Sequence, residues 1–393
     1  MNYILIDGPS RDALLPFTYT RPVAEIRVGI LTIREKWEKF LNTEISTQTE
    51  AYLSKKYPLK EASQNIIINA CFLPSEKLVN AIKKLEKHQA LFYKGQFIAF
   101  FGNVSDTSQL NFFKGTEFTE DEVLTIENTW DIFSKNDLAI RKDFEILTKN
   151  RKSLPLPQNV QAISSEHIFI EENTELTFCT LNASKGPIYI GRNSVIMEGS
   201  HIRGPFAILE NSAVKMGAKI YGATTVGPHC TVGGEIKNSV LFGYSNKGHE
   251  GYIGDTVIGE WCNLGADTNT SNLKNNYASV RLWDYQEERF ATTGLQFCGL
   301  MMGDHSKCGI NTMFNTGTVV GVNANIFGSG FPRNFIPSYS WGGSKGFTTY
   351  RTKKAFEVCD VVMKRKNVPF NKEDQEILEH IFQETIKFRT SYE

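Results

Sequence analysis

The chain has 393 residues, which is too long for one compact core, so two domains and a tail are expected. Lys plus Arg and Asp plus Glu balance at 43 each, which argues against a nucleic-acid partner. The start of the sequence shows no basic leader, and no segment reaches the length of a membrane span, so we expect a cytoplasmic protein without membrane contact. Seven cysteines without a CxxC pair indicate neither a metal site nor a disulfide framework.

The first part of the chain alternates strand and helix signals. A strand at 3–6 runs into a Gly-Pro-Ser turn, and further signals follow at 30–41, 64–68, 75–85 and 96–101. This alternation predicts an α/β, Rossmann-like domain. A polar run at 149–153 then meets Pro155 and Pro157, which is typical of a linker. We therefore place the first domain at 1–155.

A repeat of six residues follows the linker. The branched aliphatic anchors are Ile190, Ile196, Ile202, Ile208, Val214, Ile220, Val226 and Val232. Two residues before each anchor the side chain is mostly small, as at Ser194, Ser200 and Ser212. Neither a helix nor an alternating strand sustains a period of six. The pattern predicts a parallel β-helix of hexapeptide repeats whose anchors point to the axis, and it resembles the left-handed version.

The repeat is interrupted after Val232 and resumes at Met302, so we expect a long break over 233–301 that keeps hexad fragments at Ile258 and Leu264. Within it, the polar stretch 271–277 is predicted to loop out of the coil stack. Cys230 and Cys308 fall on core registers and are expected to be buried. The β-helix is placed at 156–345. The tail, 346–393, has helical spacing at 352–364 and 373–387, and these helices are expected to pack on the last coil or on a neighbouring subunit.

A candidate catalytic group lies where the repeat loses register. His249 stands in the polar, glycine-flanked string Asn246-Lys247-Gly248-His249-Glu250-Gly251, which is not the apolar setting of a core histidine. A neutral imidazole takes a proton near pH 7, as a general base does when an amine attacks a thioester.

These residues, with Tyr252, Gly254-Asp255 and Asn263-Leu264-Gly265-Ala266, resemble the acetyltransferase half of the bifunctional N-acetylglucosamine-1-phosphate uridyltransferase and glucosamine-1-phosphate N-acetyltransferase family. The resemblance implies that His249 is the catalytic base, that the amide of Ala266 stabilises the oxyanion, and that Asn272 lies beside the histidine. For the acceptor sugar phosphate it implies Lys237, Tyr252 and Asn263. For acetyl-coenzyme A it implies Gly309, Ile310 and Gly328, and it also implies a homotrimer.

Some positions depart from the family pattern. A family tyrosine is Leu273 here, and the next phosphate-binding lysine has no direct counterpart, although Lys274 and Arg281 lie close. The family's phosphate arginine corresponds equally well to Lys215 or Lys219, so both remain candidates. The acceptor could therefore differ from glucosamine 1-phosphate.

The first domain resembles sugar-1-phosphate nucleotidyltransferases through its strand, its turn at Gly8 and the segment around Arg21-Pro22. The resemblance implies nucleotide binding by Gly8, Arg11 and Arg21. The family lysine after the proline is Val23, however, and the expected metal-binding Gly-Asp is Asn69-Ala70. Mg²⁺ would be needed only if this domain is active, and we predict no protein metal site.

The sequence thus predicts acetyl-coenzyme A-dependent N-acetylation of an amino-sugar phosphate coupled to uridylyl transfer from UTP, giving UDP-N-acetylglucosamine. Two alternatives stay open. One is a nucleotidyltransferase with a purely structural β-helix, and the other is a nonenzymatic sugar-nucleotide sensor.

Overall fold

The computed structural model describes residues 1–107, 114–119 and 123–390. The chain forms two compact units. The first consists of Met1–Leu14, Thr20–Ile26 and Leu31–Asn128, and the second of Leu15–Tyr19, Arg27–Ile30 and Thr129–Glu393. The division between the two units falls after Asn128, ahead of the domain boundary near 155 that the sequence predicts. That boundary stays a prediction.

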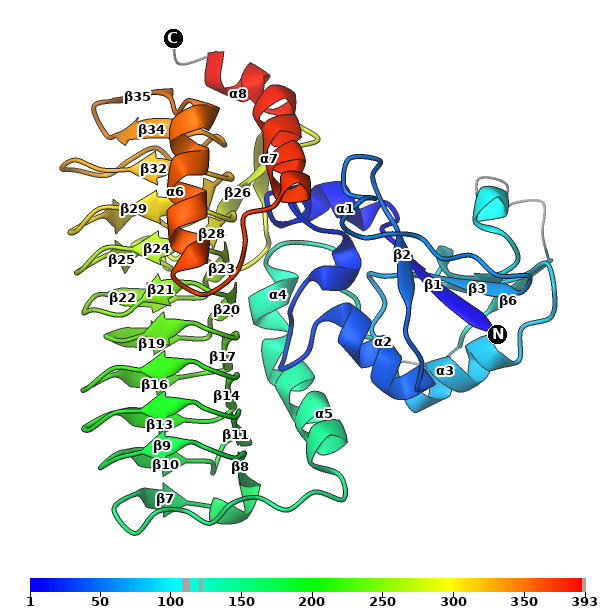
Figure 1. The fold of residues 1–393 in the computed structure, drawn as a ribbon, viewed down its shortest axis with the longest axis horizontal. Coiled ribbons are helices and arrows are strands. Elements are labelled where there is room, and N and C mark those ends of the chain that lie inside the picture. Colours follow the sequence, from blue (N-terminus) through cyan, green and yellow to red (C-terminus); the bar gives the residue numbers. More distant parts are fainter. Residues whose placement is uncertain (108–113, 120–122, 391–393) are drawn as a thin grey trace. The chain divides into compact units, whose positions relative to one another are not determined.

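The first unit is an α/β fold around a six-stranded sheet of order β2-β1-β3-β5-β4-β6 (Figure 1). Strand β1 pairs in parallel with β2 and β3, whereas β5 runs antiparallel to β3. Thr32 caps α2 in a capping box with Glu35, which satisfies two amides at the helix start. The predicted α/β class is confirmed. Its elements are β1 (Asn2–Ile6), α1 (Ser10–Ala13), α2 (Ile33–Leu41), β2 (Ser46–Gln48), β3 (Asn65–Asn69), α3 (Glu76–Lys83), β4 (Gln89–Tyr93), β5 (Gln96–Phe101) and β6 (Lys114–Glu117), with 3-10 helix η2 (Val23–Glu25).

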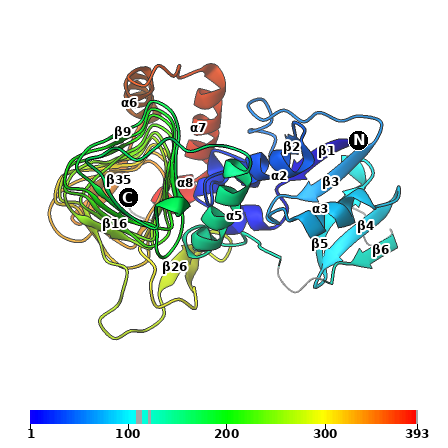
Figure 2. The ribbon, with the colours of Figure 1, turned by 90° about the horizontal axis from the view of Figure 1, so that it is seen from below.

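The second unit is a parallel β-helix with three faces, whose coils overlie one another in the view of Figure 2. The first face holds β7 (Gln161–Ile163), β10 (Thr180–Asn182), β13 (His201–Arg203), β16 (Lys219–Tyr221), β19 (Glu235–Lys237) and β22 (Tyr252–Gly254). The second holds β8 (Ile168–Ile170), β11 (Ile188–Ile190), β14 (Phe206–Ile208), β17 (Thr224–Val226), β20 (Val240–Gly243), β23 (Val257–Glu260), β28 (Leu300–Met302), β31 (Thr318–Val320) and β33 (Phe335–Ile336).

The third face holds β9 (Glu175–Leu176), β12 (Val195–Ile196), β15 (Ala213–Val214), β18 (Thr231–Val232), β21 (Asn246–Lys247), β24 (Asn263–Leu264), β29 (Lys307–Cys308), β32 (Asn325–Ile326), β34 (Ser340–Gly343) and β35 (Gly346–Thr349). A separate pair, β25 (Asn269–Thr270) and β30 (Met313–Phe314), follows the third-face strands β24 and β29 along the chain. We number the corners by the faces that they join, so that the 3/1 corner lies between the third and the first face.

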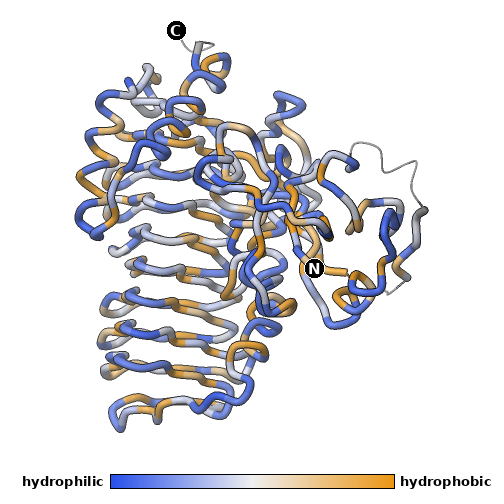
Figure 3. Tube along the Cα trace, turned by 45° about the vertical axis from the view of Figure 1, so that its right-hand side comes forward, coloured by the Kyte–Doolittle hydropathy of each residue, from blue (hydrophilic) through white to orange (hydrophobic). Residues whose placement is uncertain are grey.

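The predicted anchors form the core of this β-helix. All eight lie in one hydrophobic cluster and are at most 2% exposed. In Figure 3 hydrophobic positions recur from coil to coil. The small residues of the second register are buried as well, and their hydroxyls donate to backbone oxygens: Ser194 Oγ to Leu209 O at 2.9 Å and Ser212 Oγ to Gly227 O at 2.8 Å. The β-helix prediction is confirmed, as is the burial of Cys230 and Cys308.

The predicted break over 233–301 is wrong in its extent. Coils continue without a gap through β25, because some turns shorten and bring the next inward residues to Ile236, Leu241, Lys247 and Ile253. Only 271–299 leaves the coil stack, and it carries the antiparallel hairpin β26 (Arg281–Asp284) and β27 (Arg289–Thr292). In Figure 2 this excursion, labelled at β26, extends outward from the coils. A strict period of six missed these coils because it does not allow shorter turns.

Helices flank the β-helix at both ends of the second unit. Helix α5 packs on early coils, where Asn136 Nδ2 donates to Ala223 O at 2.9 Å. The tail helices pack on the last coils, since the Tyr339 hydroxyl donates to Leu378 O at 2.7 Å. Among the described residues, no helix is both long and apolar enough to cross a bilayer. The helices are η1 (Phe17–Tyr19), α4 (Asp131–Ser134), α5 (Asn136–Thr148), η4 (Ser165–His167), α6 (Thr352–Lys364), α7 (Lys372–Glu384) and α8 (Ile386–Thr390).

An aromatic ladder runs along the 2/3 corner. The rings of His229, Tyr244, Trp261 and His305 stack from coil to coil, with centroid distances of 4.7, 4.1 and 6.2 Å. All four residues have φ between 54° and 60°, the left-handed conformation that Asn193 and Asn211 adopt at the same corner of earlier coils. The turn conformation therefore repeats while its side chain changes from amide to aromatic.

Candidate functional site at one corner of the β-helix

His249 lies on the 3/1 corner, in the turn between β21 and β22, and its side chain is exposed. The turns of this corner stack on one another through backbone hydrogen bonds. Asp267 N donates to Glu250 O at 3.0 Å, and Asn311 N donates to Ala266 O at 2.8 Å. The first of these bonds shows that the turn at Ala266 lies one coil above the turn of His249, and coils are spaced by about 4.8 Å.

A buried lysine supports the turn that carries His249. Lys247 takes an anchor position, in register with Val232, and is 0% exposed. Its ammonium donates to the backbone oxygens of His249 and Glu250, the latter at 2.9 Å. Burial lowers the pKa of Lys247 to about 8. The sequence motif alone predicts no role for this lysine, although a charged residue in an aliphatic register is a signal in itself.

The residues predicted for the acyl donor share this corner. The Ala266 amide donates to no acceptor within the described part of the chain. Gly309 and Ile310 form the next turn, where the Ile310 side chain is 68% exposed. A Cβ on Gly265 would lie 2.4 Å from the carbonyl carbon of Gly309, so this turn admits no side chain at 265. Gly328, at φ +103°, lies in the segment that leaves β32, one coil further on.

Polar side chains on and beside the first face form a second cluster. Asn272 Nδ2 donates to Asp255 Oδ2 at 2.6 Å and to the Tyr252 hydroxyl at 3.0 Å. Asp255 also accepts from Asn238 Nδ2 at 2.7 Å. Burial, followed by the Asp255 charge, raises the pKa of Tyr252 to about 12. Asp255 accepts hydrogen bonds from both asparagines of this cluster, a role that the sequence motif does not predict.

The predicted phosphate ligands lie around that cluster. Lys237 is in register with Gly254 and places its ammonium 4.8 Å from the centroid of the Phe297 ring. Lys219, on the neighbouring strand β16, pairs with Glu250 at 3.9 Å. The stem of Lys215 passes Gly233, whose Cβ position would lie 3.2 Å from Lys215 Cβ. The structure therefore keeps both lysines near the His249 turn.

Asn263 and Lys274, two of the predicted substrate residues, lie away from this cluster. Asn263 is exposed on the third face, beside Asn246 and Lys307, whereas Tyr252 is on the first face. Within one chain the two are not brought together. Lys274 belongs to the excursion 271–299, where its ammonium donates to Ser279 O at 2.9 Å.

In the first unit, the predicted nucleotide-binding residues surround the end of β1. Gly8 has φ +60°, and a Cβ there would lie 2.9 Å from Asn69 Oδ1. Arg11 is buried, donates to the Tyr52 hydroxyl at 2.7 Å and pairs with Asp12 at 3.0 Å. Arg21 is also buried, and Val23 N donates to Asp7 Oδ1 at 2.7 Å.

These residues do not fit a Mg²⁺ site. Asn69 replaces the expected carboxylate, and its Oδ1 accepts from Cys71 N at 3.2 Å. Burial raises the pKa of Asp7 to about 6, so its carboxylate is less available to a cation. Over the described residues, three or more His, Cys, Asp or Glu side chains never gather closely enough to hold a metal ion.

Comparison with known proteins finds similarity to two groups of sequences. Residues 3–152 match the sugar nucleotidyl transferase family. The bifunctional protein GlmU of Methanococcus aeolicus is 32% identical over 120 residues, 30% of this chain and 28% of that protein. GlmU of Synechococcus elongatus is 25% identical over 223 residues, 51% of this chain and 45% of that protein. The chain is similar to the bifunctional GlmU proteins.

The predicted resemblance is therefore confirmed. The chain spans less than half the length of these GlmU relatives, between 28% and 45%. Among solved structures, the UDP-N-acetylglucosamine acyltransferase of Francisella novicida matches 59% of this chain and 88% of its own at 14% identity, with a TM-score of 0.33.

Proposed function

We propose that the β-helix transfers an acetyl group from acetyl-coenzyme A to the amine of an amino-sugar phosphate, with glucosamine 1-phosphate as the expected acceptor. The observation that carries this proposal is the 3/1 corner. There an exposed imidazole, His249, stands one coil below a backbone amide, that of Ala266, without an acceptor among the described residues. Acyl transfer needs that pair, a base for the nucleophile and a donor for the oxyanion.

In the proposed mechanism His249 accepts the proton of the sugar amine as the nitrogen attacks the thioester carbonyl carbon. The Ala266 amide stabilises the tetrahedral oxyanion, a contribution of about 3 kcal/mol for one such donor. The carbon–sulfur bond then breaks, and the thiolate takes the proton from the imidazolium. Acetylated sugar and free coenzyme A leave, and no redox change occurs.

Residues of this chain would orient both substrates. The glycine-rich turns at Gly309, Ile310 and Gly328 would lie along the acyl donor. The Lys237 ammonium, with Lys215 or Lys219, would hold the acceptor phosphate as a charge-assisted partner. The Tyr252, Asn272 and Asp255 cluster would hold sugar hydroxyls, since each member offers a polar atom at the first face.

A thiol-release assay with acetyl-coenzyme A and glucosamine 1-phosphate tests this proposal. We expect His249→Ala to lower kcat at least 100-fold, because general-base catalysis typically contributes that much. His167→Ala is the matched control, since His167 is also an exposed histidine of the β-helix. Equal thiol release by His249→Ala and the control would refute the assignment and favour a structural β-helix.

The match of residues 3–152 to sugar nucleotidyl transferases supports a second activity, uridylyl transfer from UTP to the acetylated sugar phosphate. The poor fit to Mg²⁺ gives no basis for a step through that ion. Pyrophosphate release from UTP, measured with and without Mg²⁺, tests this activity. If neither pyrophosphate nor coenzyme A is released while ligands still raise the melting temperature, the chain is a sugar-nucleotide sensor.

We also infer a homotrimer, which would let a neighbouring copy contribute to the site. Asn263 lies on the third face and Tyr252 on the first within one chain, and adjacent copies would bring such residues together. Light scattering after gel filtration should give three times the mass of one chain. Mixed Asn263→Ala and Tyr252→Ala variants should then regain activity.

A further inference from the structure

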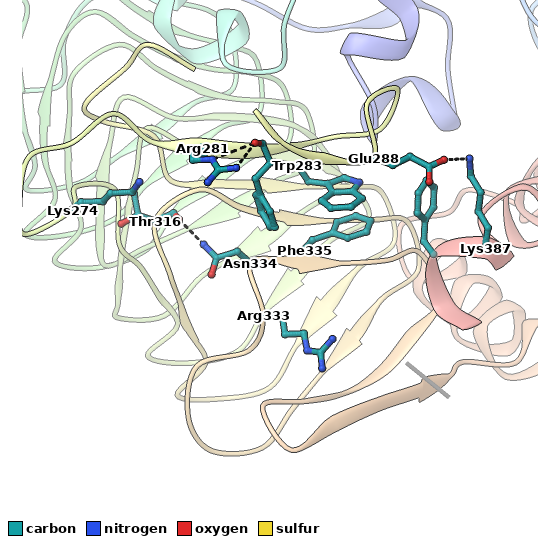
Figure 4. Close-up of a pocket in the computed structure, with 11 residues that line it drawn as sticks. Lys274, Arg281, Trp283, Glu288, Thr316, Arg333, Asn334, Phe335 and Lys387 are labelled. Carbon is teal, nitrogen blue, oxygen red and sulfur yellow. Dashed lines mark hydrogen bonds and ion pairs between the residues drawn. The ribbon is translucent and has the colours of Figure 1, made fainter. Parts of the chain in front are cut away.

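A pocket of about 870 Å³ opens where the excursion 271–299 meets the last coils and α8 (Figure 4). Hairpin β26–β27, the turn after β30, the start of β33 and α8 contribute its walls. Its volume falls in the range of small-molecule sites, roughly 300–1,000 Å³. It therefore has the size of a ligand site.

The lining is strongly basic. Lys274, Arg281, Arg333 and Lys387 line the pocket against one carboxylate, that of Glu288, which pairs with Lys387. Four cations against one anion leave three positive charges in the lining. Clusters of this kind bind phosphate, because guanidinium groups present several donors in a fixed geometry.

Backbone contacts hold two of these cations in place. Arg281 Nη2 donates to Phe290 O at 2.6 Å, and Lys274 Nζ donates to Ser279 O at 2.9 Å. Each contact uses only part of the group's donors, since a guanidinium has five and an ammonium three. The remaining protons are available to a ligand, at little further cost in side-chain entropy.

One wall of the pocket is aromatic. Trp283 and Phe335 stack face to face, as Figure 4 shows, and their ring centroids lie 4.1 Å apart with planes 7° apart. Phe290 and Phe388 stand edge-on to Trp283 at 5.4 and 6.3 Å. Such an interlocked cluster is rigid and apolar, so it favours a planar or apolar ring next to the charged groups.

We propose that this pocket binds a nucleoside phosphate, with the phosphates at Arg281, Lys274 and Arg333 and the base against the aromatic wall. The site goes beyond the proposed acetyl transfer. Lys274 and Arg281, which lie close in sequence to the family's second phosphate position, line the pocket, whereas Lys237 and Tyr252 do not, and His249 lies on the 3/1 corner rather than at the excursion. A ligand here would join the hairpin to α8 and the last coils.

Isothermal titration of the full chain with uridine diphosphate, adenosine diphosphate and inorganic pyrophosphate tests the proposal. We expect both nucleotides to bind more tightly than pyrophosphate and to weaken as salt is raised. The double variant Arg281→Gln/Arg333→Gln should lose at least tenfold in affinity at this site, as expected for charge-assisted contacts. Arg289→Gln, on the same hairpin but outside the lining, is the control for the loss of one arginine charge from the hairpin.

Identical isotherms for wild type and double variant would overturn the proposal, as would equal affinity for pyrophosphate and nucleotides. Displacement by saturating glucosamine 1-phosphate would also overturn it, because the pocket would then belong to the acceptor site. Lys274→Gln serves if the double variant does not fold. Thiol release by the same variants is measured separately, so failure of the acetyl-transfer proposal stays distinguishable.

Discussion

The buried ammonium of Lys247 donates a hydrogen bond to the backbone oxygen of His249. The lysine side chain lies inside the β-helix, in the column of aliphatic anchors, and the histidine side chain lies outside. The turn that carries the candidate base is thus held from within by a charge. A buried charge costs free energy unless it is paired, so this contact is better explained as positioning the turn than as stabilising the fold.

Lys247→Met tests this positioning role, because methionine keeps the length and apolar stem of the side chain. We expect kcat for acetyl transfer to fall about 100-fold, the effect of a displacement near 1 Å at a reacting group. The KM for acetyl-coenzyme A should change little. Lys307→Met is the matched control, since Lys307 Nζ donates to His305 O at 2.8 Å on the 2/3 corner. A similar loss in both variants would mean that the effect is general instability.

The lowered pKa of Lys247 predicts a pH dependence of stability. With a folded pKa of about 8 and an unfolded value of roughly 10.4, the unfolded chain binds more protons between these values. The free energy of unfolding contributed by this group therefore rises as pH increases through that window. Against Lys247→Met, wild type should gain on the order of 3 kcal/mol from pH 7 to 10.5. Denaturant melts at several pH values measure it, and a constant difference would contradict the shift.

Much of the fold could be predicted from the sequence because the β-helix is set by local periodicity. The anchors from Ile190 to Val232 repeat every six residues and are all buried. The coils at Ile236 and Ile253 were missed, since their turns are shorter than the repeat allows. The aromatic ladder was missed too, because His229 and Trp261 are adjacent only through the stacking of coils.

For the site, the motif around His249 could be predicted from the sequence, whereas the side-chain contacts that surround it could not. In the sequence Asp255 is only part of a motif, because its contacts with Asn238 and Asn272 come from different coils. The positions of Asn263 and Tyr252 on separate faces likewise depend on the three-dimensional path. Sequence spacing finds residues within one turn and does not show which face they share.

The contact between Asn272 and Asp255 predicts the effect of a charge change on the acceptor site. In Asn272→Asp a second carboxylate would replace the amide that donates to Asp255 at 2.6 Å. Like charges at that separation repel, so we expect the KM for the amino-sugar phosphate to rise at least tenfold. Asn275→Asp makes the same change at an exposed position of the excursion and should leave the KM unchanged. Steady-state kinetics with a varied acceptor decide between a binding role and a structural one.

The aromatic ladder predicts where the β-helix is most sensitive to truncation. Trp261 is 6% exposed and stacks against Tyr244 at 4.1 Å, so its removal would leave a cavity in the middle of the ladder. We expect Trp261→Ala to lower the free energy of unfolding by about 3 kcal/mol or more. Phe331→Ala, at a residue that is 53% exposed, should cost far less. Urea denaturation of both variants measures the difference, and equal losses would show that the stacked rings do not stabilise the corner.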